Sequence, residues 1–241
     1  MFQNLFKNMG NVTKNLLIIN GLFFLASVVM ESRGIDLVKT LGLYYPSSQH
    51  FESYQIVTHF FMHGGFSHIL FNMLGLVFMG SHLERYWGDK KFLIFYVVTA
   101  LGAAFLHTVV QGFEIYLASG EIFPYMHIGE FINGSATVDT NLTSNIQYIG
   151  ELYKTPTVGA SGAIYGLILA FGYLFPNTEF MLYFAIPVKA KWLAVGLAVY
   201  ALYNGYQNAA GDSVAHFAHL GGMLFGFILI KYWQKNSSQF Y

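Results

Sequence analysis

Four polar side chains lie near the starts of three apolar segments, and their types suit acyl-transfer chemistry. Ser161 lies within the stretch GASG at 159–162, and His219 lies near the start of the last apolar segment. A serine hydroxyl becomes a nucleophile when an imidazole within hydrogen-bonding reach accepts its proton. His68 and Asn72 are four residues apart on one helix face, so both side chains can donate to a developing oxyanion. Free N–H groups at the start of the serine's helix can add further donors.

We expect these four side chains to lie at a common depth in a membrane. Placing a polar side chain in lipid costs free energy, so polar residues in spanning segments are candidates for function. At about 1.5 Å per residue, Ser161 at the start of its segment, His219 about six residues into its own, and His68 and Asn72 in their first turns lie at similar depths. No Asp or Glu lies inside the segments near this depth, so a Ser–His dyad is expected. Asp212 precedes His219 by two turns and is expected to face water.

Small residues recur every four positions beside both candidate catalytic residues. The two series are Gly162, Gly166 and Ala170, and Ala218, Gly222 and Gly226. Such ridges let helix backbones approach closely in lipid. If they face each other, Ser161 and His219 come within reach, and Tyr165, one turn after the serine, can pack on the imidazole ring. Gly159 and Gly162 leave room for an incoming backbone.

Each motif has a structural interpretation when it is taken alone. GASG is typical of helix packing. It also lacks the G-x-S-x-G pattern of soluble hydrolases, because residue 163 is Ala. His68 and Asn72 can simply bond across helices. The joint pattern of the four side chains favours catalysis.

The composition is that of a membrane protein. The 241 residues are 55% hydrophobic and 10% charged, whereas soluble domains carry about 25% charged residues. The formal net charge is zero, so nothing indicates a nucleic-acid partner or an acidic substrate. There are no cysteines, which excludes disulfides, thiolate metal sites and a thiol nucleophile.

The apolar segments predict an all-α, polytopic membrane protein built as a six-helix bundle in the lipid bilayer. Segments long enough to span lie at residues 15–31, 68–84, 92–111, 158–175, 190–207 and 213–233. The predicted organisation is a cytoplasmic N-terminal segment (1–14), a membrane domain (15–233) and a cytoplasmic tail (234–241). The first span follows lysines as a signal peptide does. It lacks a convincing small-residue cleavage site, so we expect an uncleaved helix.

The basic residues support this count and give an orientation. With the N-terminus in the cytoplasm, nine of the twelve basic residues lie inside, which is a positive-inside bias. The nine are Lys7, Lys14, Arg85, Lys90, Lys91, Lys189, Lys191, Lys231 and Lys235; Arg33, Lys39 and Lys154 lie outside. We expect both termini in the cytoplasm and a location in the plasma membrane or a bacterial inner membrane.

The composition of three connecting segments predicts how each of them is structured. Residues 33–67 mix aromatic and polar groups and predict a folded loop lying partly in the membrane interface. Residues 112–157 are more polar and predict an exposed loop or a small lid. Residues 175–191 contain two prolines, which favour a re-entrant or interfacial excursion over a seventh span.

These motifs resemble the rhomboid intramembrane serine proteases. The resemblance rests on HILFN at 68–72, GASG at 159–162, and AHLGGMLFG at 218–226, which fits the family's AHxxGxxxG. It covers roughly residues 50–230, with the elements in the family's order.

The resemblance implies a six-helix membrane core with Ser161 as nucleophile and His219 as general base. His68, Asn72 and the Ser161 N–H would surround the oxyanion. The implied reaction cuts peptide bonds within or beside transmembrane helices of protein substrates, without a cofactor. This sequence departs from the family at Tyr54-Gln55, where many members carry Trp-Arg, and the loop before the fourth span is longer than in compact bacterial members. His63 matches a histidine common in the family, and its role is open.

Three alternatives compete with this prediction. A catalytically inactive relative would bind transmembrane helices without cutting them, although such relatives commonly lack the serine or histidine. Five histidines offer metal-ligand spacings, although HExxH is absent: His59, His63, His68, His216 and His219. A transporter or channel would show repeats or a charged residue at mid-membrane, and neither is visible in the sequence.

Overall fold

The protein is mostly helical in a computed structural model that describes residues 9–120, 122, 150–182, 186–207 and 215–236. The first half contains α2 (Asn11–Glu31), α3 (Leu37–Leu41), α4 (Gln55–Thr58), the 3-10 helix η1 (His59–Phe61), α5 (Phe66–Gly75), the π-helical turn η2 (Leu76–Gly80), α6 (Ser81–Trp87) and α7 (Asp89–Ser119). The second half contains a helical segment at 150–154, α10 (Ser161–Leu174), strands β1 (Glu179–Leu182) and β2 (Ile186–Lys189), α11 (Ala190–Gln207) and α12 (His216–Asn236).

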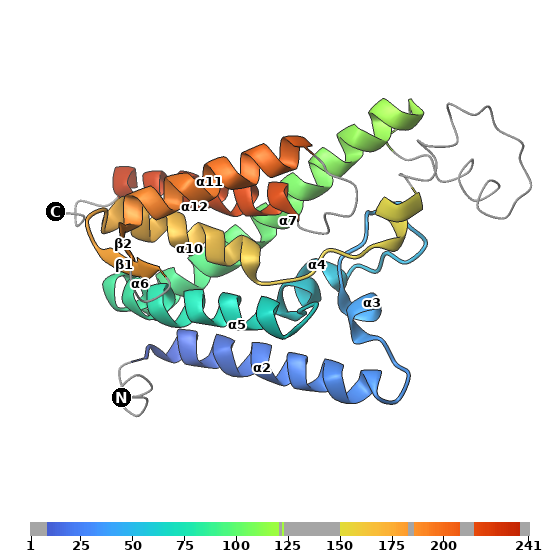
Figure 1. Cartoon of the computed structure of the whole chain (residues 1–241), viewed down its shortest axis with the longest axis horizontal. Coiled ribbons are helices and arrows are strands. Elements are labelled where there is room, and N and C mark those ends of the chain that lie inside the picture. Colours follow the sequence, from blue (N-terminus) through green and yellow to red (C-terminus); the bar gives the residue numbers. More distant parts are fainter. Residues whose placement is uncertain (1–8, 121, 123–149, 183–185, 208–214, 237–241) are drawn as a thin grey trace, which may run out of the picture.

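The long helices lie side by side and alternate in direction (Figure 1). α2 begins and α12 ends at the end of the bundle that carries β1 and β2, which we call the hairpin end. We call the opposite end, where α5, α10 and α12 begin, the Ser161 end. Among the described residues, three helices are long and apolar enough to cross a membrane: Asn11–Glu31, Phe66–Trp87 and Asp89–Leu117. α10 is a shorter apolar helix, so the count of six spans stays a prediction.

The fourth helix is shorter than the segment expected at 158–175, because its ends are fixed by local backbone. It begins at Ser161, since Gly159 has a φ of +122° and residues 155–160 are not helical. It ends at Leu174, before Pro176, which has no N–H to continue a helix. α10 is therefore about 21 Å long, and Ser161 is its first residue.

The loop expected from residue 112 begins later in the structure. α7 continues to Ser119, where Gly120 adopts the left-handed conformation of a helix C-cap. The extra turns are stabilised by Ile115, which is fully buried. In Figure 1, α7 projects beyond the rest of the bundle at the Ser161 end.

The described residues are mostly helical, which agrees with the all-α prediction, and one short β-hairpin departs from it. The segment at 175–191, expected as a re-entrant or interfacial excursion, contains the antiparallel hairpin β1–β2, in which Glu179 pairs with Lys189 and Leu182 with Ile186. Pro187 on β2 lies directly opposite Met181, and both strands of this two-stranded sheet are edge strands. An edge strand tolerates a proline, because no neighbouring strand on its free side requires an N–H donor.

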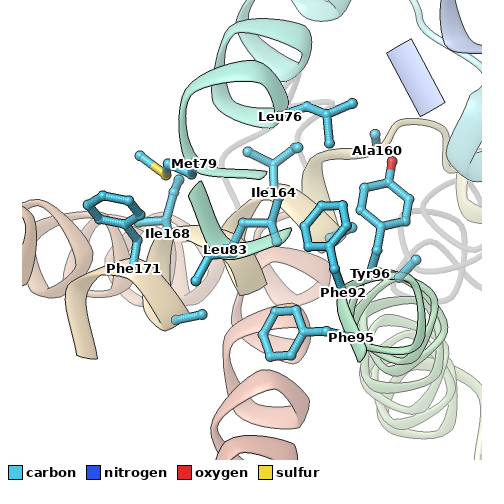
Figure 2. Close-up of a cluster of buried hydrophobic side chains, with 14 of the residues drawn as sticks. Leu76, Met79, Leu83, Phe92, Phe95, Tyr96, Ala160, Ile164, Ile168 and Phe171 are labelled. Carbon is cyan, nitrogen blue, oxygen red and sulfur yellow. The ribbon is translucent and has the colours of Figure 1, made fainter. Parts of the chain in front are cut away.

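The main core lies between the second, third and fourth long helices. Figure 2 shows side chains from the continuous helix 66–87, from α7 and from α10 pointing toward one another. Leu76, Leu83, Phe92, Phe95 and Leu167 are each fully buried. Since lipid gives no hydrophobic drive for helices to associate, close packing of these groups holds the helices together.

A buried carboxylate joins the first helix to the second at the hairpin end. Glu84 is 2% exposed and accepts hydrogen bonds from the backbone N–H groups of Val12 and Thr13, both at 2.8 Å. The Thr13 hydroxyl donates to the same carboxylate at 2.6 Å. These are the free N–H groups of the first turn of α2, where a negative charge is favoured by the helix dipole.

Three expectations lie wholly or mainly outside the described residues. They are the exposed loop or lid, of which 123–149 is not described, the position of Asp212, and the outer parts of both terminal segments.

Candidate active site

The backbone leading to Ser161 is held by the loop that follows α3. Leu43 and Thr157 form an isolated antiparallel bridge, with N–H to carbonyl distances of 2.8 and 2.9 Å. Two residues later, the Gly159 N–H donates to the His59 carbonyl at 2.9 Å. Gly159 then turns the chain into the helix through its positive φ. Ser161 thus begins α10 from a fixed backbone.

The structure brings Ser161 and His219 together. The His219 Nε2 lies 2.9 Å from the Ser161 Oγ, although the residues are 58 positions apart in sequence. His219 is 8% exposed, and its Nδ1 has no hydrogen-bond partner among the described residues. The imidazole can therefore accept the hydroxyl proton at Nε2 while Nδ1 keeps its own.

The approach of the two residues follows from the packing of α10 against α12 through glycines. A Cβ on Gly222 would overlap the carbonyl of Gly162, and a Cβ on Gly226 would lie 3.5 Å from the Gly166 Cα. The two small-residue ridges predicted from the sequence therefore face each other. Any larger side chain at the closest point would separate the helices that carry Ser161 and His219.

Tyr165 covers one face of the His219 imidazole. Its ring stacks on His219 with a centroid separation of 4.0 Å and an interplanar angle of 9°. On another side, the ring of His216 meets His219 edge-on at 6.2 Å. These contacts restrict the rotation of the His219 ring.

His68 reaches the same site from α5. Its ring would lie 2.7 Å from a Cβ on Gly159, so a glycine is needed at that position for the imidazole to approach. The Gly64 N–H donates to the His68 Nδ1 at 3.4 Å. In the neutral ring this leaves the proton on Nε2, one of the atoms nearest Gly159. His68 is thus a hydrogen-bond donor beside Ser161.

Asn72 contributes an unused buried donor. The residue is 5% exposed, and its Nδ2 has no hydrogen-bond partner among the described residues. Nearby on the same helix, Gly75 packs tightly on α10, since a Cβ there would lie 2.7 Å from the Ile164 side chain. A buried amide without a partner is rare, and a catalytic role is one of the explanations for such a group.

A small cavity adjoins Ser161 on the side facing α7. Its walls include His59, Gly162 and the small side chains Ala100, Ala103 and Ala104. From the sequence, His59 was considered only as a possible metal ligand, and these alanines were not predicted at the site. Alanines at such spacing are common in membrane helices, and the role of the His59 carbonyl depends on backbone geometry, so no sequence signal distinguished them.

The histidines proposed as alternative metal ligands do not form a ligand set. Across the described ranges, no group of three or more His, Asp or Glu side chains is close enough to hold a metal ion. His59 instead uses its Nδ1 to bond the Gln55 carbonyl at 2.8 Å. His63 lies against His68 with ring centroids 5.1 Å apart.

Comparison with known proteins identifies a matching family and several relatives. The Rhomboid domain family matches residues 50–235. The chain is 28% identical over 170 residues to RHOMBOID-like protein 12, mitochondrial, of Arabidopsis thaliana, which covers 69% of this chain and 42% of that protein. It is 25% identical over 237 residues to the rhomboid protease GlpG of Photorhabdus laumondii, covering 97% of this chain and 65% of the relative.

A third relative, the rhomboid protease GlpG of Yersinia pestis, is 26% identical over 197 residues, which is 80% of this chain and 52% of that protein. The chain therefore spans from 42% to 65% of the length of these three relatives. Since the family match covers most of the chain and includes all four polar side chains of the site, this is a membrane protein of the rhomboid family.

Proposed function

We propose that the chain is an intramembrane serine endopeptidase that hydrolyses peptide bonds in or beside the transmembrane helices of membrane-protein substrates. The observation that carries the proposal is the 2.9 Å contact between the His219 Nε2 and the Ser161 Oγ, in a chain of the rhomboid family. Two relatives are named as proteases, and that name supports the same chemistry here.

In the proposed reaction, neutral His219 accepts the Ser161 proton as the hydroxyl oxygen attacks the scissile carbonyl. The negative charge that develops on the carbonyl oxygen is stabilised by the Ser161 N–H, the Asn72 Nδ2 and the His68 Nε2–H. His219 then donates its proton to the leaving amine, which breaks the peptide bond and leaves an acyl-serine. A water molecule, deprotonated by His219, hydrolyses that ester and restores the serine.

A substrate helix must unwind locally before its carbonyl becomes accessible, because an intact helix hides its backbone. We therefore expect cleavage beside small or helix-weakening residues and poor cleavage of rigid polyleucine helices. In this proposal Gly159 and Gly162 leave space for the unwound segment.

The charge distribution supports an orientation with the hairpin end in the cytoplasm. Described basic residues there are Lys14, Arg85, Lys90, Lys91, Lys189, Lys191, Lys231 and Lys235. Only Arg33, Lys39 and Lys154 lie at the other end. We propose six spans in the domain 15–233, both termini in the cytoplasm, Ser161 near the outer face, and the plasma membrane or a bacterial inner membrane as the location.

The test is cleavage of a model transmembrane substrate in liposomes by the wild type, Ser161→Ala and His219→Ala, each also with a chelator. We expect the wild type to cut with or without chelator, and both folded variants to lose activity. Cleavage by Ser161→Ala would overturn the assignment of the nucleophile, and loss of activity with chelator would indicate a metal.

The same experiment separates the alternative of an inactive rhomboid-like protein that binds transmembrane helices. The relative from Arabidopsis is named only as rhomboid-like and fits either reading. A wild type that cuts none of several substrates, but is crosslinked to their helices, would favour this alternative.

A further inference from the structure

A second hydrophobic cluster lies apart from the main core, on the extension of α7. Tyr45, Ile115 and Tyr153 form it and are 3%, 0% and 7% exposed. They come from the loop after α3, from α7 and from the segment 150–154. With 31 residues, α7 is about 46 Å long and exceeds a hydrocarbon core of about 30 Å. The cluster is therefore expected outside the membrane.

Hydrogen bonds join the same elements. The Ser48 hydroxyl donates to the Tyr153 carbonyl at 2.7 Å, and the hydroxyls of Ser47 and Tyr153 are hydrogen-bonded to each other. The Tyr45 hydroxyl donates to the Ile122 carbonyl at 3.1 Å. We call Tyr45, Ser47, Ser48, Ile115 and Tyr153 the tyrosine clasp.

The tyrosine clasp packs closely against α7, and the Tyr45 hydroxyl remains a hydrogen-bond donor at neutral pH. A Cβ on Gly112 would lie 2.8 Å from the Tyr45 hydroxyl, so a glycine allows this contact. Burial raises the pKa of Tyr45 to about 12, with a smaller contribution from Tyr153, so the phenol stays protonated. The Tyr45 and Tyr153 rings lie 5.7 Å apart and pack at an angle.

From Tyr153 the chain runs to Ser161 under continuous restraint. Thr157 is bridged to Leu43, and Gly159 donates to His59. A Cβ on Gly42 would lie 2.7 Å from the Pro156 side chain and 2.8 Å from that of Val158, so the two stretches are in close contact. The four consecutive residues from Pro156 to Gly159 are thus each in contact with residues 42–59.

The loop that restrains this segment is itself held by a buried glutamine. Gln55 is 1% exposed, and its amide donates to the carbonyls of Thr40 at 3.2 Å and His50 at 2.9 Å. Its side-chain oxygen accepts from the Glu52 N–H at 3.1 Å. The loop that contacts the segment leading to Ser161 is therefore itself ordered, so it can hold that segment in a fixed position.

We propose that the tyrosine clasp positions Ser161, with Tyr153 as the positioning residue that fixes the segment entering α10. The inference rests on the proposed function, since it concerns the rate at which Ser161 is acylated. A displacement of about 1 Å at a reacting atom can lower a rate about 100-fold. Loosening the clasp should therefore slow acylation while leaving substrate binding by the bundle unchanged.

The experiment compares Tyr153→Ala, Tyr153→Phe and Ser48→Ala with Leu83→Ala. Leu83 is fully buried in the main core on α6, so its truncation lowers stability without touching the segment leading to Ser161. For each variant we would measure kcat and KM on a transmembrane substrate, the rate of Ser161 labelling by a fluorophosphonate probe, and Tm. Hydrogen exchange of the amides at 157–160 reports whether the segment has loosened.

We expect Tyr153→Ala to lower kcat and the labelling rate by about 10- to 100-fold with KM little changed. Ser48→Ala should show a smaller loss, and Tyr153→Phe, which keeps the ring packing, should recover most of the rate. Leu83→Ala should lower Tm but keep the wild-type labelling rate in its folded fraction.

Two results would overturn the role of the clasp alone. In the first, Ser161 of Tyr153→Ala is labelled at the wild-type rate although hydrogen exchange at 157–160 is accelerated. In the second, Leu83→Ala slows the labelling of Ser161 as much as Tyr153→Ala does. A wild type that neither cuts substrates nor is labelled at Ser161 would instead count against the proposed function.

Discussion

Tyr165 lies flat against His219, with ring centroids 4.0 Å apart and planes 9° apart. The phenol belongs to the same helix as Ser161 and follows it by one turn, so α10 supplies both the hydroxyl and the surface on which the imidazole rests. The stack leaves the His219 Nε2 facing the Ser161 Oγ at 2.9 Å. Because the His219 Nδ1 has no hydrogen-bond partner among the described residues, we propose that ring stacking takes on the orienting role that an aspartate has in a triad.

Loss of the stack should therefore impair catalysis more than stability. We expect Tyr165→Ala to lower kcat about 10-fold, since an aromatic pair contributes about 0.5–1.5 kcal/mol. Tyr165→Phe should stay near wild type because it keeps the ring. Tyr203→Ala, an exposed tyrosine on α11, is the control. An equal loss in Tyr165→Phe and Tyr165→Ala would show that the hydroxyl, and not the stacking, matters.

Glycine is required where α10 and α12 cross. In Gly222→Ala the new methyl group would overlap the Gly162 carbonyl, so the helices must separate. We expect a loss of about 1–3 kcal/mol in the free energy of unfolding, together with a fall in cleavage as the Ser161–His219 contact lengthens. Gly196→Ala on α11 is the matched control, because nothing lies within 4 Å of its new methyl group.

That control should be neutral or slightly stabilising, by up to about 1 kcal/mol, because alanine favours the helix. Tm and cleavage rates of the two alanine variants, measured in the same detergent, check the prediction. A Gly222→Ala protein with wild-type Tm and activity would show that the crossing can relax without harm.

The sequence was informative where function depends on helix spacing. The ridges containing Gly162 and Gly222 predicted which helix faces meet, and that contact is seen. The extension of α7 was missed because residues 112–119 mix polar and apolar groups, and Ile115 packs with Tyr45 and Tyr153, which are far from it in the sequence. The hairpin was missed because two prolines usually break regular structure, and pairing at an edge depends on register rather than composition.

Two buried histidines outside the spanning helices predict a loss of stability in acid. Burial lowers the pKa of His59 and of His63 from 6.5 to about 4, and for His63 the nearby His68 adds to the effect. Above pH 6.5 both are neutral in either state and contribute nothing. As pH falls from 6.5 toward 4, the unfolded chain binds protons that the folded chain does not, so the free energy of unfolding decreases.

The decrease should be visible as a fall in Tm between pH 7 and pH 4.5, measured on Ser161→Ala to prevent self-cleavage. His63→Asn removes one group that titrates differently in the folded and unfolded states, so its Tm should change less steeply over this range. A slope equal to that of the parent protein would contradict the assignment of His63.

Substitution of Asn72 should distinguish a catalytic role of its side chain from a packing role. Its buried Nδ2 has no partner among the described residues, so Asn72→Ala removes an unsatisfied donor, and the Tm should be retained or raised. The same change removes one oxyanion donor, so kcat should fall by about 100- to 1,000-fold. A parallel fall in Tm and activity would instead support the reading in which Asn72 bonds across helices. A retained or raised Tm together with a reduced kcat would support a role for Asn72 in the transition state. Removal of a side chain that packs across helices would instead lower the stability of the folded protein.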